Sequence, residues 1–175
     1  GKATCITIGA NNLTLDCNAF TITYSNSSTG YGVNITGFNN ITIKNCMFAR
    51  LNQSVQSTAG IYVTLANSST FLNNTINSHG NYSFGIQAIS SNFTNITINV
   101  LNISGNFSYG IGLGLSGLNN ITSNNITTSS GLYGYGINLT GSSQNFVSGN
   151  TVTTNGTTNN YGIYLQTTAN NNSVA

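Results

Sequence analysis

Charge is almost absent from this chain. Only Lys2, Asp16, Lys44 and Arg50 of its 175 residues carry a formal charge, 2% against about 25% in an ordinary globular protein. General acid–base pairs, carboxylate metal sites and basic nucleic-acid surfaces all need more such residues. A net charge of +2 is also too small to steer a charged partner or attract a membrane surface. We therefore expect no nucleic-acid partner, no metal and no cofactor.

Other residues are missing as well. Glutamate, proline and tryptophan do not occur, and no apolar run approaches the roughly 18 residues of a membrane span. His79 is the only imidazole and has no acidic neighbour in the sequence, so we interpret it as an exposed turn residue. Asp16 is the only carboxylate, whereas glycoside hydrolysis normally needs two. We expect no catalytic residue and no enzyme activity.

Asparagine, threonine, serine and glycine instead make up more than half of the chain, with 32, 25, 21 and 20 copies. Polar low-complexity sequences are usually disordered because they bury too little apolar surface. Here, however, the apolar residues recur in short alternating runs such as Ile6-Thr7-Ile8 and Ile41-Thr42-Ile43. That period of two is typical of half-buried β-strands.

A repeat organises these runs. A cassette of aromatic residue, glycine and aliphatic residue returns along the chain, and its glycines stand at positions 32, 60, 85, 110, 136 and 162, with spacings of 25 to 28 residues. Aliphatic or aromatic residues also recur one and three positions after each glycine, and eleven and sixteen positions after the first five glycines. Apolar columns at constant offsets indicate that each repeat lies on its predecessor.

A polar column stands fourteen residues after each of the first five glycines. It contains Cys46 and a series of asparagines, and in the first coil we match Asn18 to it, so the predicted ladder comprises Asn18, Asn74, Asn99, Asn124 and Asn150. Amides stacked at about 4.8 Å can hydrogen-bond along the stacking axis. The sequence therefore predicts an all-β fold, a right-handed parallel β-helix of about 6.5 coils with three short strands per coil. In the first coil we also match Phe20 to Phe48, and the first strand needs a one-residue slip to turn Ile6 and Ile8 inward.

These columns and the asparagine ladder resemble the right-handed parallel β-helix of the pectate-lyase-like superfamily, with short repeats similar to those of NosD-like proteins. The segments 5–8, 12–18 and 40–46 resemble β-helix modules of archaeal cell-surface proteins. The catalytic aspartates, calcium-binding acids and arginine base of the superfamily's enzymes have no counterparts here. We expect one solenoid domain over residues 1–175, either a segment of a longer solenoid or a subunit that stacks head to tail.

Three cysteines allow two interpretations. Cys17 and Cys46 occupy nearly equivalent places on consecutive coils, at a spacing that a disulfide tolerates, and Cys5 is the rival partner. In an oxidising compartment we expect one disulfide and one remaining thiol. Alternatively, all three are small buried residues.

Asn-x-Ser/Thr sequons occur seventeen times. The strand alternation creates part of this excess, but it also points asparagine and threonine outward, where a glycan could attach. We expect glycans at sequons in turns, namely Asn26, Asn52, Asn81, Asn106 and Asn155.

Aromatic residues form two rows. One precedes the repeat glycines and comprises Tyr31, Phe84, Tyr109, Tyr135 and Tyr161; the other stands two residues earlier, at Tyr82, Phe107 and Tyr133. Stacked rings are ordinary packing in a solenoid, and the alternative is a sugar-stacking strip.

Together these features favour an extracellular structural protein of the cell surface, a building segment of a filament, spike or adhesin stalk that is N-glycosylated. Its expected partners are further copies of itself or flanking domains of a longer chain. The alternative is an adhesion module that binds glycans or a surface without catalysis.

Overall fold

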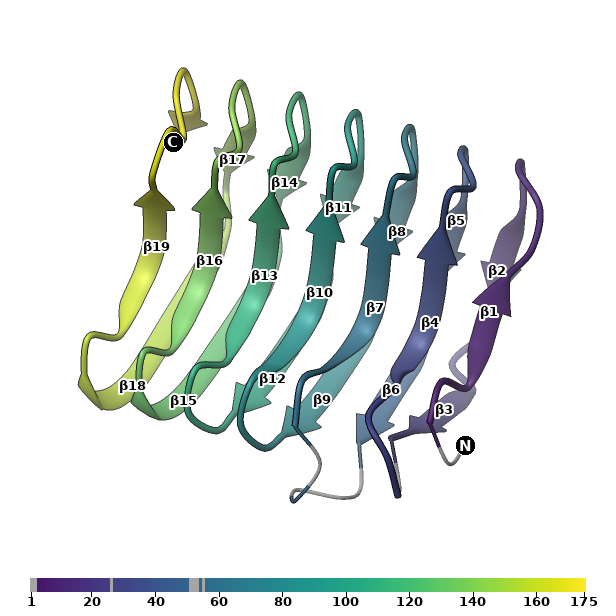
Figure 1. The fold of residues 1–175 in the computed structure, drawn as a ribbon, viewed down its shortest axis with the longest axis horizontal. Helices are drawn as coiled ribbons and strands as arrows, with labels where there is room; N and C mark the ends of the chain where they lie inside the picture. Colours follow the sequence, from purple (N-terminus) through teal and green to yellow (C-terminus); the bar gives the residue numbers. More distant parts are fainter. Residues whose placement is uncertain (1–2, 26, 51–53, 55) are drawn as a thin grey trace.

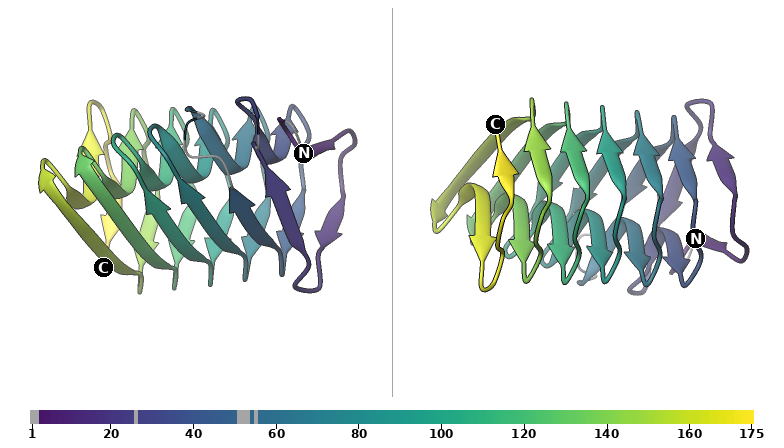
Figure 2. Two further views of the ribbon diagram at one scale, coloured as in Figure 1. Left: turned by 90° about the horizontal axis from the view of Figure 1, so that it is seen from below. Right: turned by 90° about the horizontal axis from the view of Figure 1, so that it is seen from above.

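The computed structural model describes residues 3–25, 27–50, 54 and 56–175. The chain winds through seven coils that lie side by side along one axis, and three parallel sheets run along that axis (Figure 1). Two further views show the strands of each sheet following one another from coil to coil (Figure 2). No helix long and apolar enough to cross a membrane occurs among the described residues. The predicted all-β parallel solenoid is confirmed.

The first sheet contains one strand from every coil, and each strand pairs in parallel with the strand one coil away. It contains β1 (Ile6–Ile8), β4 (Tyr31–Thr36), β7 (Thr58–Thr64), β10 (Ser83–Ile89), β13 (Tyr109–Gly114), β16 (Tyr135–Thr140) and β19 (Tyr161–Gln166).

The second sheet has shorter strands in the same order. It contains β2 (Thr14–Asp16), β5 (Thr42–Lys44), β8 (Thr70–Leu72), β11 (Asn95–Thr97), β14 (Asn120–Thr122), β17 (Phe146–Ser148) and β20 (Ser173–Val174).

The third sheet closes the first six coils. It contains β3 (Thr21–Tyr24), β6 (Met47–Arg50), β9 (Thr75–His79), β12 (Val100–Ser104), β15 (Asn125–Leu132) and β18 (Thr151–Thr158).

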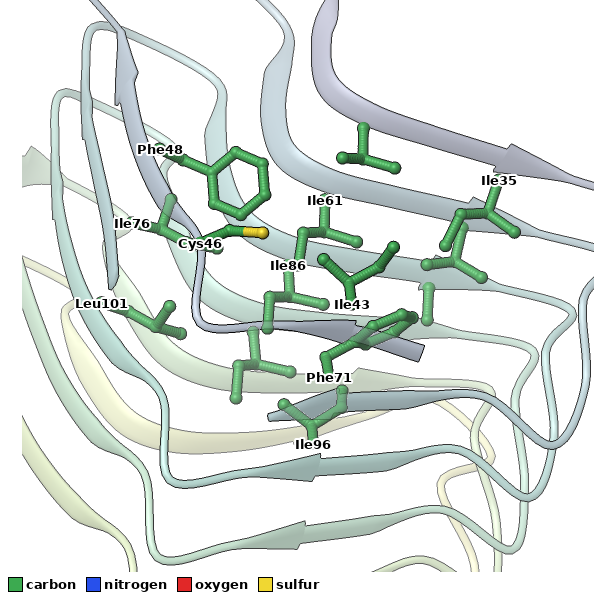
Figure 3. Packing of buried hydrophobic residues seen from close by; sticks show 14 of the residues in the cluster. Ile35, Ile43, Cys46, Phe48, Ile61, Phe71, Ile76, Ile86, Ile96 and Leu101 are labelled. Carbon is green, nitrogen blue, oxygen red and sulfur yellow. The ribbon is translucent and has the colours of Figure 1, made fainter. Parts of the chain in front are cut away.

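The core consists of the predicted apolar columns. In the first sheet, Val33 pairs with Ile61, and Ile86 pairs with Ile111, all four fully buried. Figure 3 shows how side chains of the three sheets meet inside the coils, with Phe48 and Phe71 the largest of those labelled. Alternate residues of each strand point to this interior, so a period of two in the sequence produces one continuous core.

The repeat glycines lie where side chains from the third sheet cross the first sheet. A β-carbon at Gly110 would lie 2.3 Å from Ile126 Cγ2 and 2.6 Å from the carbonyl oxygen of Gly136. Real Cβ atoms essentially never show contacts this short, and one of the two partners is backbone. Glycine is therefore required by the close approach of neighbouring chain segments.

Coil 1 departs from the later coils. Ile6 and Ile8 pair with Val33 and Ile35, so the one-residue slip of the first strand is present. The match of Phe20 to Phe48 is wrong, because Ile22 pairs with Phe48 while Phe20 is 75% exposed. β2 pairs with β5 at an offset of 28 residues and β3 with β6 at 26, so the corner between β2 and β3 holds two extra residues.

Candidate functional site

The buried amides form a hydrogen-bonded ladder at the corner between the second and third sheets. The Nδ2 of Asn74 donates to Asn99 Oδ1 over 3.0 Å, and that of Asn99 donates to Asn124 Oδ1 over 2.9 Å. The series continues from Asn124 to Asn150 Oδ1 at 2.9 Å. Each Nδ2 also donates to a backbone carbonyl, as in Asn99 to Phe71 O at 2.9 Å. Each shared oxygen accepts a backbone N–H as well, so the donors and acceptors of these buried amides satisfy one another.

Asn18 does not belong to this ladder, contrary to the prediction. It is exposed, has a left-handed backbone (φ 46°), and its N–H donates to Asp16 Oδ1 at 3.1 Å. The two extra residues of the coil 1 corner displace it from the stack. Cys17 lies at this corner instead and forms a disulfide with Cys46, with their Cα atoms 4.7 Å apart. Cys5 is a free, exposed thiol.

A second buried ladder was missed by the sequence reasoning. At the corner between the first and second sheets, Asn119 Nδ2 donates to Asn145 Oδ1 at 3.0 Å, and Asn145 Nδ2 donates to Asn172 Oδ1 at 2.9 Å. Asn119 and Asn145 stand nine residues after repeat glycines, an offset that would have identified them. The signal is weak because the equivalent residues of earlier coils are Ser69 and Thr94.

The charged groups lie near the N-terminal end. Asp16 and Lys44 are paired across neighbouring coils, with 3.2 Å between Oδ2 and Nζ. Hydrogen bonds from the Asn45 amide and the Asn18 N–H, together with Lys44, hold the pKa of the exposed Asp16 carboxyl below its usual value. Lys2 lies outside the described residues.

Arg50 is buried inside the solenoid, 3% exposed, and donates to Ser83 Oγ. Burial lowers the pKa of this guanidinium and raises the pKa of the fully buried neighbour Tyr24 to about 12. Tyr24 pairs with Arg50 in the third sheet. Both side chains are buried inside the coil.

His79 ends strand β9 and is exposed, and its Nδ1 lies 2.8 Å from Ser104 Oγ. No group of three or more His, Cys, Asp or Glu side chains that could hold a metal ion occurs in the described part of the chain. In the described part of the chain, His79 therefore belongs to no such cluster of side chains.

The predicted glycan acceptors differ in accessibility. Asn26 and Asn52 lie outside the described residues. Asn81 and Asn106 lie in turns and are partly buried, and Asn81 Oδ1 accepts the N–H of Asn106 at 2.9 Å. Asn155 is exposed, but it lies within strand β18 and not in a turn, because that strand extends beyond the length that the repeat suggested.

The aromatic rows lie on the outside of the coils. In the row before the glycines, Tyr109 and Tyr135 are stacked with 4.9 Å between ring centroids. Phe84 meets Tyr109 edge to face at 79°, and Tyr31 stacks on Tyr62 of the next coil. In the second row, Tyr82, Phe107 and Tyr133 stack at 5.0 and 5.1 Å. Most rings therefore cover one another's faces, which leaves few faces for a sugar.

An open groove of about 250 Å³ lies on the outer face of the first sheet, across coils 4 to 6. Its floor is β13, where both outward positions are glycine, Gly112 and Gly114. The neighbouring coils carry side chains at these positions, Gln87 and Ile89 on one side and Asn138 and Thr140 on the other. The rings of Phe84 and Tyr109 line one end, and Leu115 lines the groove as well.

Comparison with protein families agrees with this architecture. A family model described as a right-handed β-helix region matches residues 13–175. The chain belongs to the right-handed β-helix family. The resemblance found in the sequence is thus confirmed for the fold, which the family shares with pectate-lyase-like and NosD-like proteins. Comparisons with curated proteins and with solved structures found no match for this β-helix.

Proposed function

We propose that this β-helix is a non-catalytic structural protein of the cell surface, a building segment of a filament, spike or adhesin stalk. One observation carries the proposal: the buried asparagine amides form hydrogen bonds to one another along the axis of the solenoid. Such a ladder can be extended coil by coil, and a fully satisfied buried network rigidifies the structure. Its neighbours along the axis would be further copies or flanking coils of a longer chain.

The chemistry of the surface supports a role without catalysis. Asp16, the only carboxylate of the sequence, is paired with Lys44, and the only histidine contacts a serine hydroxyl. Acid–base catalysis usually needs two such groups with separated pKa values in one cleft. The Cys17–Cys46 disulfide supports an oxidising, extracellular location.

Stability against acid tests the structural proposal. Asp16 is the only side-chain carboxyl of the sequence, and its lowered pKa contributes stability that is lost as the pH falls below about 3.8. This loss should be small because Asp16 is exposed. Urea denaturation midpoints from pH 8 to pH 2 should therefore be nearly constant, and Asp16→Asn should remove the remaining slope. A steep loss of stability in acid, retained in Asp16→Asn, would contradict the proposal.

N-glycosylation of the outer surface belongs to the same proposal. Of the predicted acceptors that the structure describes, Asn155 is exposed and the turn residues Asn81 and Asn106 are partly buried, whereas the sequon residue Asn138 is only 7% exposed. In native material, the peptides that cover residues 1–175 should together have a mass above the 18.3 kDa of the bare chain. Asn155→Gln should remove one glycan mass. A native mass equal to that of the polypeptide would end this part of the proposal.

A second candidate function, adhesion through carbohydrate binding, is favoured by one observation, the groove over Gly112 and Gly114. It is compatible with the structural role because a stalk can carry a binding site on its side.

A further inference from the structure

We propose that two copies of this chain pair side by side through the outer face of the first sheet, with Leu115 of each copy seated in the groove over Gly112 and Gly114 of the other. This lateral pairing goes beyond the proposed function, in which copies or coils follow one another along the axis. Four features carry it: exposed apolar residues in a strained conformation, a projection beside a hollow, the composition of the face, and its size.

Three large apolar side chains are exposed at the corner between the first and second sheets, and we call them the apolar ridge: Phe93, Leu115 and Leu118. Their exposed fractions are 56%, 70% and 45%. Phe93 and Leu118 are neighbours on consecutive coils, because the N–H of Phe93 donates to the carbonyl of Gly117 at 3.3 Å. Leu115 lies at the same corner and lines the groove. Apolar side chains gathered in this way mark an interaction surface.

The backbone of the ridge has a conformation that disfavours these residues. Phe93, Leu115 and Leu118 have φ angles of 56°, 51° and 58°, in the left-handed region that bulky side chains avoid. On the next coil Gly141 takes the place of Leu115, and Gln144 that of Leu118. A leucine that is mostly exposed gains little burial in return for this strain. A partner that covers the ridge compensates for both costs.

The ridge and the groove lie side by side on one face. Leu115 directly follows Gly114, so a projecting side chain stands next to a position that has none. The groove has a volume of about 250 Å³ and an apolar lining that includes Phe84 and Ile89. A two-fold axis parallel to the solenoid axis, placed between ridge and groove, sets Leu115 of each copy over the groove of the other. A face that complements itself in this way selects a second copy of the chain.

The composition of the face suits an interface. The strands of the first sheet contain no Asp, Glu, Lys or Arg, and aromatic rings such as Tyr62, Tyr109 and Tyr135 lie on its outside. The centres of protein interfaces are enriched in aromatic residues and depleted in charged ones. Because residues 51–175 contain no Asp, Glu, Lys or Arg, two copies do not repel each other across this face.

The size of the face sets the expected affinity. Seven strands about 4.8 Å apart, each with up to about six residues of about 3.3 Å, give a face of roughly 30 Å by 20 Å, or about 600 Å². Stable dimers bury about 800 Å² per copy, and weaker pairs bury less. We therefore expect a dimer with a Kd in the micromolar range.

Sedimentation velocity of the chain over a concentration series that spans the micromolar range tests this pairing. The sedimentation coefficient should rise from that of a monomer to that of a dimer. Leu115→Asn removes the projecting side chain and keeps a residue that accepts a left-handed backbone, so it should raise the dimer Kd at least about tenfold. The matched control is Ile98→Asn, since Ile98 is 53% exposed with a φ of 57° but lies between β11 and β12, at the corner of the second and third sheets. It should leave the Kd unchanged.

Gly114→Thr fills the groove with the side chain that Thr140 carries on the next coil, and should raise the dimer Kd as much as Leu115→Asn does. A β-carbon at Gly114 would lie 3.9 Å from Ile89 Cγ1, an ordinary contact, so the coil should keep its fold. The proposal is overturned if the chain stays monomeric throughout the series, if either variant associates as tightly as the parent, or if Ile98→Asn weakens association equally. Association beyond a dimer that persists in Leu115→Asn would assign the contact to the axis and also overturn lateral pairing. Each of these results leaves the acid-stability test of the structural role unaffected.

Discussion

The corner between the second and third sheets is built in two ways along the axis. Between coils 1 and 2 a disulfide joins Cys17 and Cys46, whereas from Asn74 onward a series of amides bridges one coil to the next. Cys46 connects the two regions, because its N–H donates to Asn74 Oδ1 at 3.1 Å. The disulfide and the amide hydrogen bonds both fit the same spacing between coils, but a cysteine can form a disulfide with only one partner. An amide donates on one side and accepts on the other, so it alone can repeat.

The two regions also differ in charge. The Asp16–Lys44 pair and the buried Arg50 belong to coils 1 and 2, while coils 3 to 7 contain no Asp, Glu, Lys or Arg. The N-terminal region thus combines a covalent bond with ionic groups, and the rest depends on neutral hydrogen bonds. Variants directed at one region should leave the other intact, since each coil of a solenoid contacts only its neighbours.

The largest effect is expected from Asn99→Leu in the amide ladder. The change removes the acceptor of the Asn74 N–H, one of the two acceptors of Asn74 Nδ2, and the amide donor to the carbonyl of Phe71, all inside the core. At about 1–3 kcal/mol for each buried unsatisfied group, partly relieved by relaxation, we expect a loss of about 3–5 kcal/mol in urea denaturation. Asn102→Leu, a neighbouring exposed amide that bonds Asn77, should change stability by less than about 0.5 kcal/mol. Equal effects of the two variants would show that the ladder contributes nothing.

The disulfide should come next. It closes a separation of 29 residues, for which chain entropy predicts about 3–4 kcal/mol. Replacing Cys17 and Cys46 together by alanine should reduce amide hydrogen-exchange protection in coils 1 and 2 and leave coils 4 to 6 nearly unchanged. Cys5→Ala, which removes the free thiol, is the control and should have no effect. A loss of protection spread evenly over all coils would mean that the two regions form one cooperative unit.

A smaller effect is expected in alkali. Burial raises the pKa of Tyr24 from about 10 to about 12, so its contribution is complete below pH 10 and is lost as the pH rises toward 12. The maximum loss is about 3 kcal/mol, at about 1.4 kcal/mol for each pH unit. Tyr24→Phe should reduce the decline of the urea midpoint between pH 10 and 12 while changing it little at pH 8. An unchanged alkaline decline in this variant would show that Tyr24 is not its source.

The sequence predicted best those positions at which the same type of residue occupies the same place in every coil. The column that contains Ile61, Ile86 and Ile111 was predictable because side chains at a constant offset from the repeat glycine point in the same direction in every coil. Asn74, Asn99, Asn124 and Asn150 were found for the same reason. Asn18 and Phe20 were misplaced because two extra residues in one corner shift everything after them, and a repeat count does not show where the extra residues are accommodated.

Fold class, coil length, apolar columns and the absence of paired acids thus follow from the sequence by itself, because they depend on periodicity and composition. The tertiary structure alone decided that Cys17 is the partner of Cys46, which rings stack on one another, and that a groove lies over Gly112. The physical reason is that each depends on contacts between neighbouring coils, about 25 residues apart in the chain and about 4.8 Å apart in space. At that distance a single residue more or less in a corner, or a glycine in place of a glutamine, changes which atoms meet.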